Sequence, residues 1–195
     1  MLMNHDIEAP GGAVRSPIDT SLVNTSHVDS ALADSAADPV IAAFGAAAVA
    51  RGVSRLFVRH QILVQPEVSL RNHRRADLMG INAKGEIIIV EIKCSKADLL
   101  GDQKWPEYLE YCDRYFWAVP VGFDLSPFEK PVFLPERAGL IVADAYDAEM
   151  VRPAAYVPVA AARRKTETQR LARVAMRRLM TITDPDLTKM QMDWE

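Results

Sequence analysis

The order of hydrophobic and polar positions divides the chain into three parts. Residues 1–37 show neither helical nor strand periodicity, and they are rich in Ser, Asp, Ala, Pro and Gly. We expect them to form a disordered acidic tail. Residues 38–160 alternate between strand and helix patterns and are expected to form one globular domain, and residues 161–195 form a basic C-terminal helix and tail.

The globular part begins with a helix pattern and continues with strand patterns. Asp38 as N-cap and Pro39 at the first helical position predict a buried helix to about Val53. Three strands are expected next, at 57–70 (one bent strand or two), 75–81 and 86–93. A turn at 82–85 should join the last two as an antiparallel hairpin.

A helical crossover follows the hairpin. Ser95 and Asp98 resemble a capping box, so a helix should open at Lys96. Pro106 either kinks it or begins a second helix that ends near Asp113. The runs 115–119 and 139–143 suit buried strands, with a Pro-rich loop between them. Strand, helix and strand in this order predict a mixed sheet.

The C-terminal helix, expected over 160–181, is strongly basic. Seven basic residues accompany one acid, Glu167. The packing face is predicted to consist of Leu171, Val174, Ala175 and Leu179. The basic residues fit a solvated face, or alternatively a phosphate track or a partner surface.

Length, charge and cysteine content bound the class of protein, and the negative net charge is only a weak argument against nucleic-acid binding. The 195 residues fit one domain, and the net charge of −3 comes from the tail, since residues 1–37 carry −4 and the rest +1. Two cysteines are too few for a disulfide framework, and an acidic N-terminus does not fit a secretory signal. The most apolar run, 39–50, is too short to span a bilayer. A cytoplasmic location and no membrane partner are expected.

Candidate chemistry lies in the second strand of the hairpin. Side chains alternate between faces of a strand, so Glu91 and Lys93 share one face with Ile87 and Ile89, and 88, 90 and 92 point to the other. Burying opposite charges on an otherwise apolar central strand is costly and is weak evidence for stability. This placement indicates a functional role.

Asp77, on the other strand of the hairpin, can lie level with Glu91 across a four-residue turn. Two adjacent carboxylates repel each other, and a hard divalent cation such as Mg2+ relieves that repulsion. Lys93 beside the metal can hold an attacking water, help to deprotonate it, and neutralise the charge that develops on phosphorus. The alternative is a charged hairpin face that is exposed to solvent.

Other residues near the hairpin have two readings each. Four basic residues precede Asp77: Arg71, His73, Arg74 and Arg75. They suit phosphate contacts at the entrance of a site, or they form an ordinary polar loop. For the aromatic residues Trp105, Tyr108 and Tyr111, core packing is favoured over base stacking.

An acid on one strand followed by Glu-x-Lys on the next is the pattern of the PD-(D/E)XK phosphodiesterase superfamily. More specifically, the runs 75–78 (RADL) and 90–114 (VEIKCSKADLLGDQKWPEYLEYCDR) resemble the MmcB family of bacterial DNA repair proteins, over roughly residues 40–155. This resemblance implies a restriction-endonuclease-like α/β fold, with a central mixed β-sheet flanked by helices. It also implies a DNA repair function.

The resemblance assigns roles to individual residues. Asp77 and Glu91 would bind Mg2+ or Mn2+ together with the Ile92 carbonyl, and Lys93 would be catalytic. Ser95, Asp98, Asp102 and Lys104 would contact phosphate or support the metal site. Arg74 and Arg75 are expected to contact substrate because of their position just before Asp77, not because of the resemblance. Many relatives carry a Glu on the first helix, and this chain has none there. Either Glu67 substitutes for it or the second metal position is absent.

The function expected is therefore a metal-dependent nuclease that acts on DNA, with other repair proteins as further partners. One alternative is a catalytically inactive DNA-binding or scaffold protein of the same fold. Another is a phosphodiesterase that acts on RNA or a nucleotide. The sequence leaves the oligomeric state open.

Overall fold

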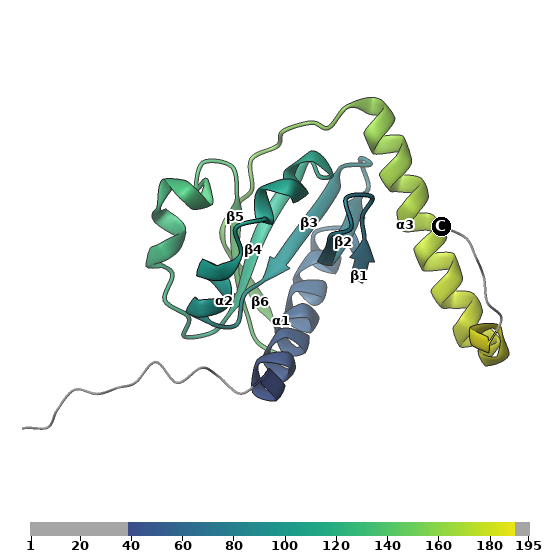
Figure 1. Cartoon of the computed structure of the whole chain (residues 1–195), viewed down its shortest axis with the longest axis horizontal. Coiled ribbons are helices and arrows are strands. Elements are labelled where there is room, and N and C mark those ends of the chain that lie inside the picture. Colours follow the sequence, from purple (N-terminus) through teal and green to yellow (C-terminus); the bar gives the residue numbers. More distant parts are fainter. Residues whose placement is uncertain (1–38, 190–195) are drawn as a thin grey trace, which may run out of the picture. The chain divides into compact units, whose positions relative to one another are not determined.

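The computed structural model describes the backbone of residues 39–189 and the side chains from Gly45 onward. Within these residues, six strands form one mixed sheet in the order β1-β2-β3-β4-β5-β6 (Figure 1). The strands are β1 (Ile62–Ser69), β2 (Arg75–Asn82), β3 (Ile87–Ile92), β4 (Arg114–Pro120), β5 (Gly139–Ala143) and β6 (Ala148–Arg152). β3, β4 and β5 are parallel to one another, and the remaining pairs are antiparallel. The expected α/β class, with a central mixed sheet flanked by helices, is confirmed. The predicted tail, 1–37, lies outside the described residues.

Helix α1 (Pro39–Arg59) is longer than predicted, and the strand expected from Phe57 begins only at Ile62. The reason is helical spacing, since Val49, Val53 and Phe57 recur every four residues and all three are buried. Gln61, with φ of 58°, ends the helix and redirects the chain into β1.

The edge strand β6 was not predicted from the sequence. Its side chains are only half-buried or exposed, and its sequence, AEMVR, carries no run of buried hydrophobic residues. Pairing with β5 specifies this strand, which is an interaction that local periodicity does not report.

The β2–β3 hairpin forms as predicted, with antiparallel pairing. Its turn is organised by Asn82, whose Oδ1 accepts hydrogen bonds from the N–H groups of Lys84 and Glu86, at 2.9 and 3.0 Å. Gly85 has φ of +78°, a conformation that glycine adopts without steric cost.

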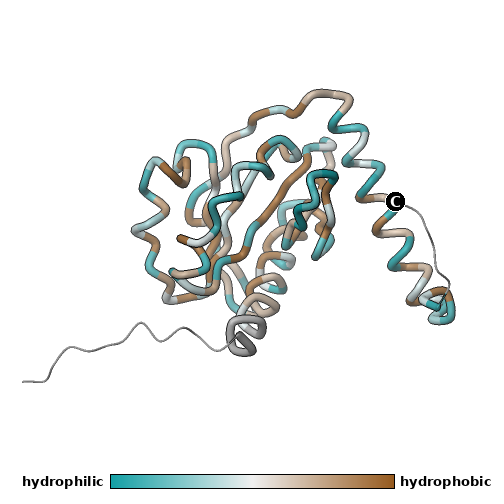
Figure 2. Tube along the Cα trace, viewed as in Figure 1, coloured by the Kyte–Doolittle hydropathy of each residue, from teal (hydrophilic) through white to brown (hydrophobic). Residues whose placement is uncertain are grey.

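The two faces of β3 pack into two different hydrophobic clusters. Ile87 and Ile89 face the cluster that contains Trp117, whereas Ile88 and Val90 face the cluster formed with α1. Figure 2 shows β3 as hydrophobic along most of its length. The predicted alternation is confirmed. It places the Glu91 side chain on the face of the sheet that does not pack against α1.

The β3–β4 crossover covers the face of the sheet opposite α1. Helix α2 (Lys96–Gly101) has Ser95 as its N-cap, which accepts a hydrogen bond from the Asp98 N–H at 3.1 Å, as the capping box predicts. A separate 3₁₀ helix, η1 (Trp105–Glu110), follows with Pro106 in its first turn, and it ends before the predicted Asp113. Trp105, Tyr108 and Tyr111 are buried, so the prediction of core packing is confirmed.

Helix α3 (Ala161–Thr183) is attached to the sheet by an ion pair between a half-buried arginine and a buried acid. The Asp113 carboxylate, 1% exposed, receives two hydrogen bonds from Arg164, at 2.7 and 2.8 Å. Leu171 is buried as predicted, but Leu179 is 65% exposed, so its place on the packing face is wrong. Polar residues of α3 occupy part of the inner face instead, including the fully buried Glu167. No helix among residues 39–189 is long and apolar enough to cross a membrane.

Candidate functional site

Asp77 and Glu91 face each other where β2 and β3 separate. The last pair of the ladder at this end is Leu78 opposite Val90. Because the strands are antiparallel, the next position on each strand carries one of the two acids. Asp77 is therefore level with Glu91, as the hairpin predicts.

The two side chains replace the backbone ladder at this point. The Glu91 Oε1 accepts a hydrogen bond from the Asp77 N–H at 3.3 Å. The Asp77 Oδ2 accepts one from the Ile92 N–H at 2.7 Å. Each carboxylate thus bonds the backbone of the opposite strand, which holds both oxygen-bearing groups at the opening between the strands.

The Ile92 carbonyl is directed to the same opening. The next residue, Lys93, donates its N–H to the Ala118 oxygen of β4 at 2.9 Å. In an extended strand, the peptide groups of successive residues point to opposite edges. The backbone groups of Ile92 therefore face β2, where its N–H meets Asp77, and the carbonyl oxygen lies on that side.

Burial raises the proton affinity of both acids. Glu91 is only 4% exposed, and burial, reinforced by the nearby charge of Asp77, raises its pKa well above the ordinary value. Burial also raises the pKa of Asp77, although the Ile92 N–H and the charge of Lys93 oppose the shift. A cation between the two carboxylates would remove this penalty, so the donor set fits a hard divalent metal.

Lys93 is buried on the same face, with 6% of its surface exposed. Its ammonium nitrogen lies 2.7 Å from an Asp102 oxygen and 3.7 Å from an Asp98 oxygen. Burial alone would lower the pKa of Lys93, but the hydrogen bond to Asp102 and the charge of Asp98 outweigh it and raise that pKa. Lys93 is thus held as a cation.

Aromatic side chains pack next to these charged groups, on the same face of the sheet. Trp117 is the register partner of Glu91 on β4, and its ring centre lies 6.0 Å from the Lys93 nitrogen. Tyr115 and Trp105 pack against Trp117, each with ring centres 5.1 Å away. Apolar side chains lower the local dielectric constant and so strengthen the electrostatic interactions of the neighbouring charged groups. The sequence analysis did not connect Tyr115 and Trp117 with the site, although the parallel register of β3 and β4 places them there.

The described residues contain no group of three or more His, Cys, Asp or Glu side chains that could hold a metal ion. A metal at Asp77 and Glu91 would therefore take its other ligands from the Ile92 carbonyl, water and substrate. Mg2+ commonly binds in this way, with one or two carboxylates and several waters. Glu67 lies opposite Asp77 but is not paired with it in the β1–β2 ladder, because its backbone has φ of +52°. Its side chain forms an ion pair with Arg75. The structure does not bring Glu67 into a third-ligand position.

The other predicted residues differ in what their side chains contact. Asp98 and Asp102 reach Lys93, whereas Ser95 caps α2 and is not bonded to the acids. Arg74 makes a double hydrogen bond with Glu107, at 2.9 and 3.0 Å. Lys104 is exposed, and no ion pair of its side chain occurs among the described residues. It is thus better placed than Arg74 to meet a phosphate.

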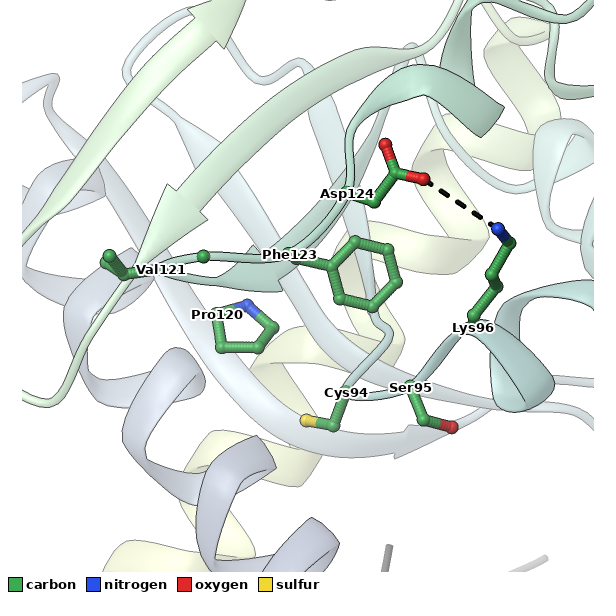
Figure 3. Close-up of a pocket in the computed structure, with 8 residues that line it drawn as sticks. Cys94, Ser95, Lys96, Pro120, Val121, Phe123 and Asp124 are labelled. Atoms are coloured by element: carbon green, nitrogen blue, oxygen red, sulfur yellow. Dashed lines mark ion pairs between the residues drawn. The ribbon is translucent and has the colours of Figure 1, made fainter. Parts of the chain in front are cut away.

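A pocket opens beside this site, at the carboxyl ends of β3 and β4 (Figure 3). It is lined by Cys94, Ser95, Lys96, Pro120, Val121, Gly122, Phe123 and Asp124. Lys96 and Asp124 form an exposed ion pair of 3.8 Å over the ring of Phe123. Neither Asp77, Glu91 nor Lys93 lines the pocket, so it is separate from the paired acids.

Fold and site together define an α/β protein that holds a buried Glu91, a half-buried Asp77 and a buried lysine on its central hairpin. The chain belongs to the MmcB-like family, since the family model described as DNA repair protein MmcB-like matches residues 35–186. Membership in this family supports a role in DNA repair. The predicted family is confirmed.

A solved structure also matches most of the chain. It is the SPO1766 protein of unknown function from Silicibacter pomeroyi, which is 42% identical and superimposes with a TM-score of 0.67. The match covers 77% of this chain and 97% of the other. No functionally curated protein matches the chain.

Proposed function

We propose that this protein is a metal-dependent nuclease of the PD-(D/E)XK type that acts on DNA during repair. The observation that carries the proposal is the pairing of Asp77 with Glu91 at the opening between β2 and β3, with Lys93 on the same face. A buried carboxylate and a half-buried one, both with raised pKa values, need a cation when they ionise, and a neighbouring lysine suits an anionic substrate.

Asp77, Glu91 and the Ile92 carbonyl would hold Mg2+ or Mn2+. When bound, such a metal lowers the pKa of a water molecule and stabilises charge on a phosphoryl oxygen. The hydrogen bonds from the Ile92 and Asp77 N–H groups fix the two carboxylates before any metal arrives. This preorganisation limits the rearrangement that binding requires.

Lys93 would act as a fixed positive charge. Because its pKa is raised, the ammonium remains protonated at neutral pH and is a poor proton acceptor. It would orient the attacking water and neutralise the charge that develops on phosphorus. Asp102 would position Lys93 for this role through the 2.7 Å contact.

DNA would approach across the exposed basic side chains near the paired acids. The Tyr108 hydroxyl donates a hydrogen bond to the Arg75 carbonyl at 3.1 Å. Lys104 is exposed there and has no ion pair among the described residues, whereas the exposed Arg75 side chain would have to exchange Glu67 for a phosphate. Contacts of this kind would bind phosphates without reading base sequence. Other repair proteins remain proposed partners. The two cysteines are unpaired, in agreement with the reducing cytoplasm that we propose as the location.

A second candidate function is DNA binding without turnover. The ion pair between Lys93 and Asp102 favours it, since a lysine committed to a carboxylate has less charge to offer a phosphate. Single-stranded, duplex, flapped and branched DNA, labelled at one end, would be incubated with the protein and Mg2+ or Mn2+. Asp77→Asn, Lys93→Met and the exposed-turn control Lys84→Ala would be compared with the wild type.

The nuclease proposal predicts that the wild type and Lys84→Ala cut at least one substrate. Asp77→Asn and Lys93→Met should each lose about 100-fold or more, as expected when a charge-stabilising group is removed. Equal cleavage by all four proteins would indicate a contaminating nuclease and refute the mechanism. Binding of DNA without cleavage by any of them would support the non-catalytic alternative.

A further inference from the structure

Helix α3 uses one face to hold its own domain. Arg164 bonds Asp113, Leu171 is buried, and Arg178 bonds the Gln65 side chain and the Glu67 carbonyl at 2.7 and 3.1 Å. These contacts recur at helical spacing and define the inner side of α3. The opposite side is left for other contacts.

The outer side of the C-terminal half of α3 is apolar. Met176, Leu179 and Met180 are 65%, 65% and 51% exposed. They follow the spacing i, i+3, i+4 and form a stripe along the helix, which we call the outer stripe. Figure 2 shows hydrophobic and hydrophilic positions interspersed along the C-terminal half of α3. A grouped set of exposed hydrophobic side chains marks an interaction surface.

The charges that flank the outer stripe include both signs. Arg173 and Arg177 are exposed, and among the described residues neither forms an ion pair. Asp184, exposed just after the helix, likewise has no ion pair in the described part of the chain. Arg173 and Asp184 are about 16 Å apart along one helix at 1.5 Å per residue, too far to meet each other.

We propose that the outer stripe binds the outer stripe of a second copy of this chain, with the two α3 helices antiparallel and the two-fold axis at Leu179. In this arrangement the two Leu179 side chains meet at the axis, and Met176 and Met180 of each copy pack beside them. Arg173 lies beside Asp184 of the partner subunit, and the same pair repeats across the axis. Such self-complementary contacts are what a two-fold interface requires.

The pairing of charges favours a second copy over other occupants. Nucleic acid would satisfy Arg173 and Arg177 but would leave the outer stripe exposed and would repel Asp184. An acidic protein segment would also repel Asp184. Because Arg164 and Arg178 tie α3 to its own sheet, the dimer would hold two Asp77–Glu91 pairs in a fixed relation. The dimer does not depend on the proposed nuclease activity.

Site-directed crosslinking tests the position of the axis. In a Cys94→Ser background, Leu179→Cys would be compared with Val132→Cys, which is also 65% exposed but lies in the β4–β5 connection. Under mild oxidation, Leu179→Cys should form a disulfide-linked dimer at a protein concentration where Val132→Cys stays monomeric. Equal or absent crosslinking of both variants would overturn the proposal.

Light scattering after size exclusion tests the interface without a crosslink. The wild type should be dimeric, whereas Leu179→Glu should be monomeric with an unchanged circular dichroism spectrum, since the side chain is exposed. Arg173→Asp should weaken the dimer, and adding Asp184→Arg should restore it. A monomeric wild type, or a dimer that survives Leu179→Glu, would contradict the proposal. A monomeric wild type that loses DNA binding on Leu179→Glu would instead identify a nucleic-acid surface.

Discussion

The Asp77 carboxylate lies opposite Glu91 and accepts the N–H of Ile92, while Glu91 accepts the N–H of Asp77. The acids therefore complete the hydrogen bonding of two strands that part at this point. Bonds of this type hold charged groups in place, but burial of both still opposes their ionisation. The consequences for stability, catalysis and binding can be measured separately.

The buried charge of Glu91 should lower stability at neutral pH in the absence of metal. A raised pKa means that Glu91 binds its proton more tightly in the folded state than in the unfolded chain, where its pKa is 4.5. The stabilising contribution of this group is thus present below pH 4.5 and is lost as the pH rises through the folded-state pKa. Glu91→Gln, in EDTA, should raise Tm at pH 7.5 by at least ~2 °C, and the gain should vanish near pH 4.

Glu86 provides a control of opposite sign for this measurement. Burial would raise the pKa of Glu86, but the hydrogen bond from Arg114, at 2.9 Å, the charge of Arg114 and the hydrogen bond from Asn82 together outweigh it and lower that pKa. Glu86→Gln should therefore reduce Tm at pH 7.5. A destabilised Glu91→Gln protein would argue that its carboxylate is favourably paired.

Asp102 should influence catalysis through Lys93. Asp102→Asn removes the 2.7 Å partner of the ammonium, so the cation loses its fixed position. We expect cleavage to fall by about 10- to 100-fold, as for other groups that support a metal site, with Mn2+ affinity unchanged. Asp98→Asn should have a smaller effect because its oxygen is 3.7 Å away and half exposed. Equal effects of the two variants would show that proximity to Lys93 does not matter.

Removal of Arg164 should destabilise the whole domain. The Asp113 carboxylate also accepts hydrogen bonds from the Ile87 and Val159 N–H groups, at 2.7 and 2.9 Å, and it is almost fully buried. Arg164→Ala leaves this charge without its cation, which costs about 3 kcal/mol for a buried pair. Urea unfolding would measure the loss against Arg51→Ala, an exposed control. A loss below about 1 kcal/mol would mean that solvent compensates the pair.

DNA affinity should depend more on Lys104 than on Arg74. The Arg74 guanidinium is held by two hydrogen bonds to Glu107, whereas the Lys104 side chain is exposed and has no ion pair in the described structure. Lys104→Ala should weaken DNA binding and reduce the slope of log K against log salt by about 1. Arg74→Ala should change that slope less. The reverse order would place the phosphate path on the Arg74 side.

Local patterns predicted most of the fold that surrounds the site. The hairpin, the shared face of Glu91 and Lys93, and the capped helix at Lys96 each depend on neighbours close in sequence. The end of α1 was missed because the run at 57–59 suits a strand as well as a helix, and packing of Phe57 decided it. Edge strand β6 was missed because only its pairing with β5 identifies it.

For the site, the sequence predicted which residues gather but not how they are bonded. Spacing places Asp77 level with Glu91, yet the crossed backbone hydrogen bonds arise only where the strands part. The pairing of Arg74 with Glu107 joins residues 33 positions apart, so no local pattern reports it. Glu167 is buried and Arg164 bonds Asp113 on the inner side of α3, so Leu179 is left exposed on another side. Hydrophobicity alone did not predict this orientation of the helix.

Metal titration tests the central claim most directly, because it requires no knowledge of the DNA substrate. Mn2+ would be titrated by calorimetry into wild type, Asp77→Asn, Glu91→Gln and the control Lys84→Ala at pH 7.5. We predict one site in the wild type and in Lys84→Ala, with affinity reduced at least about 10-fold in both acid variants. No Mn2+ binding by the wild type, or equal binding by all four proteins, would contradict a metal site at Asp77 and Glu91.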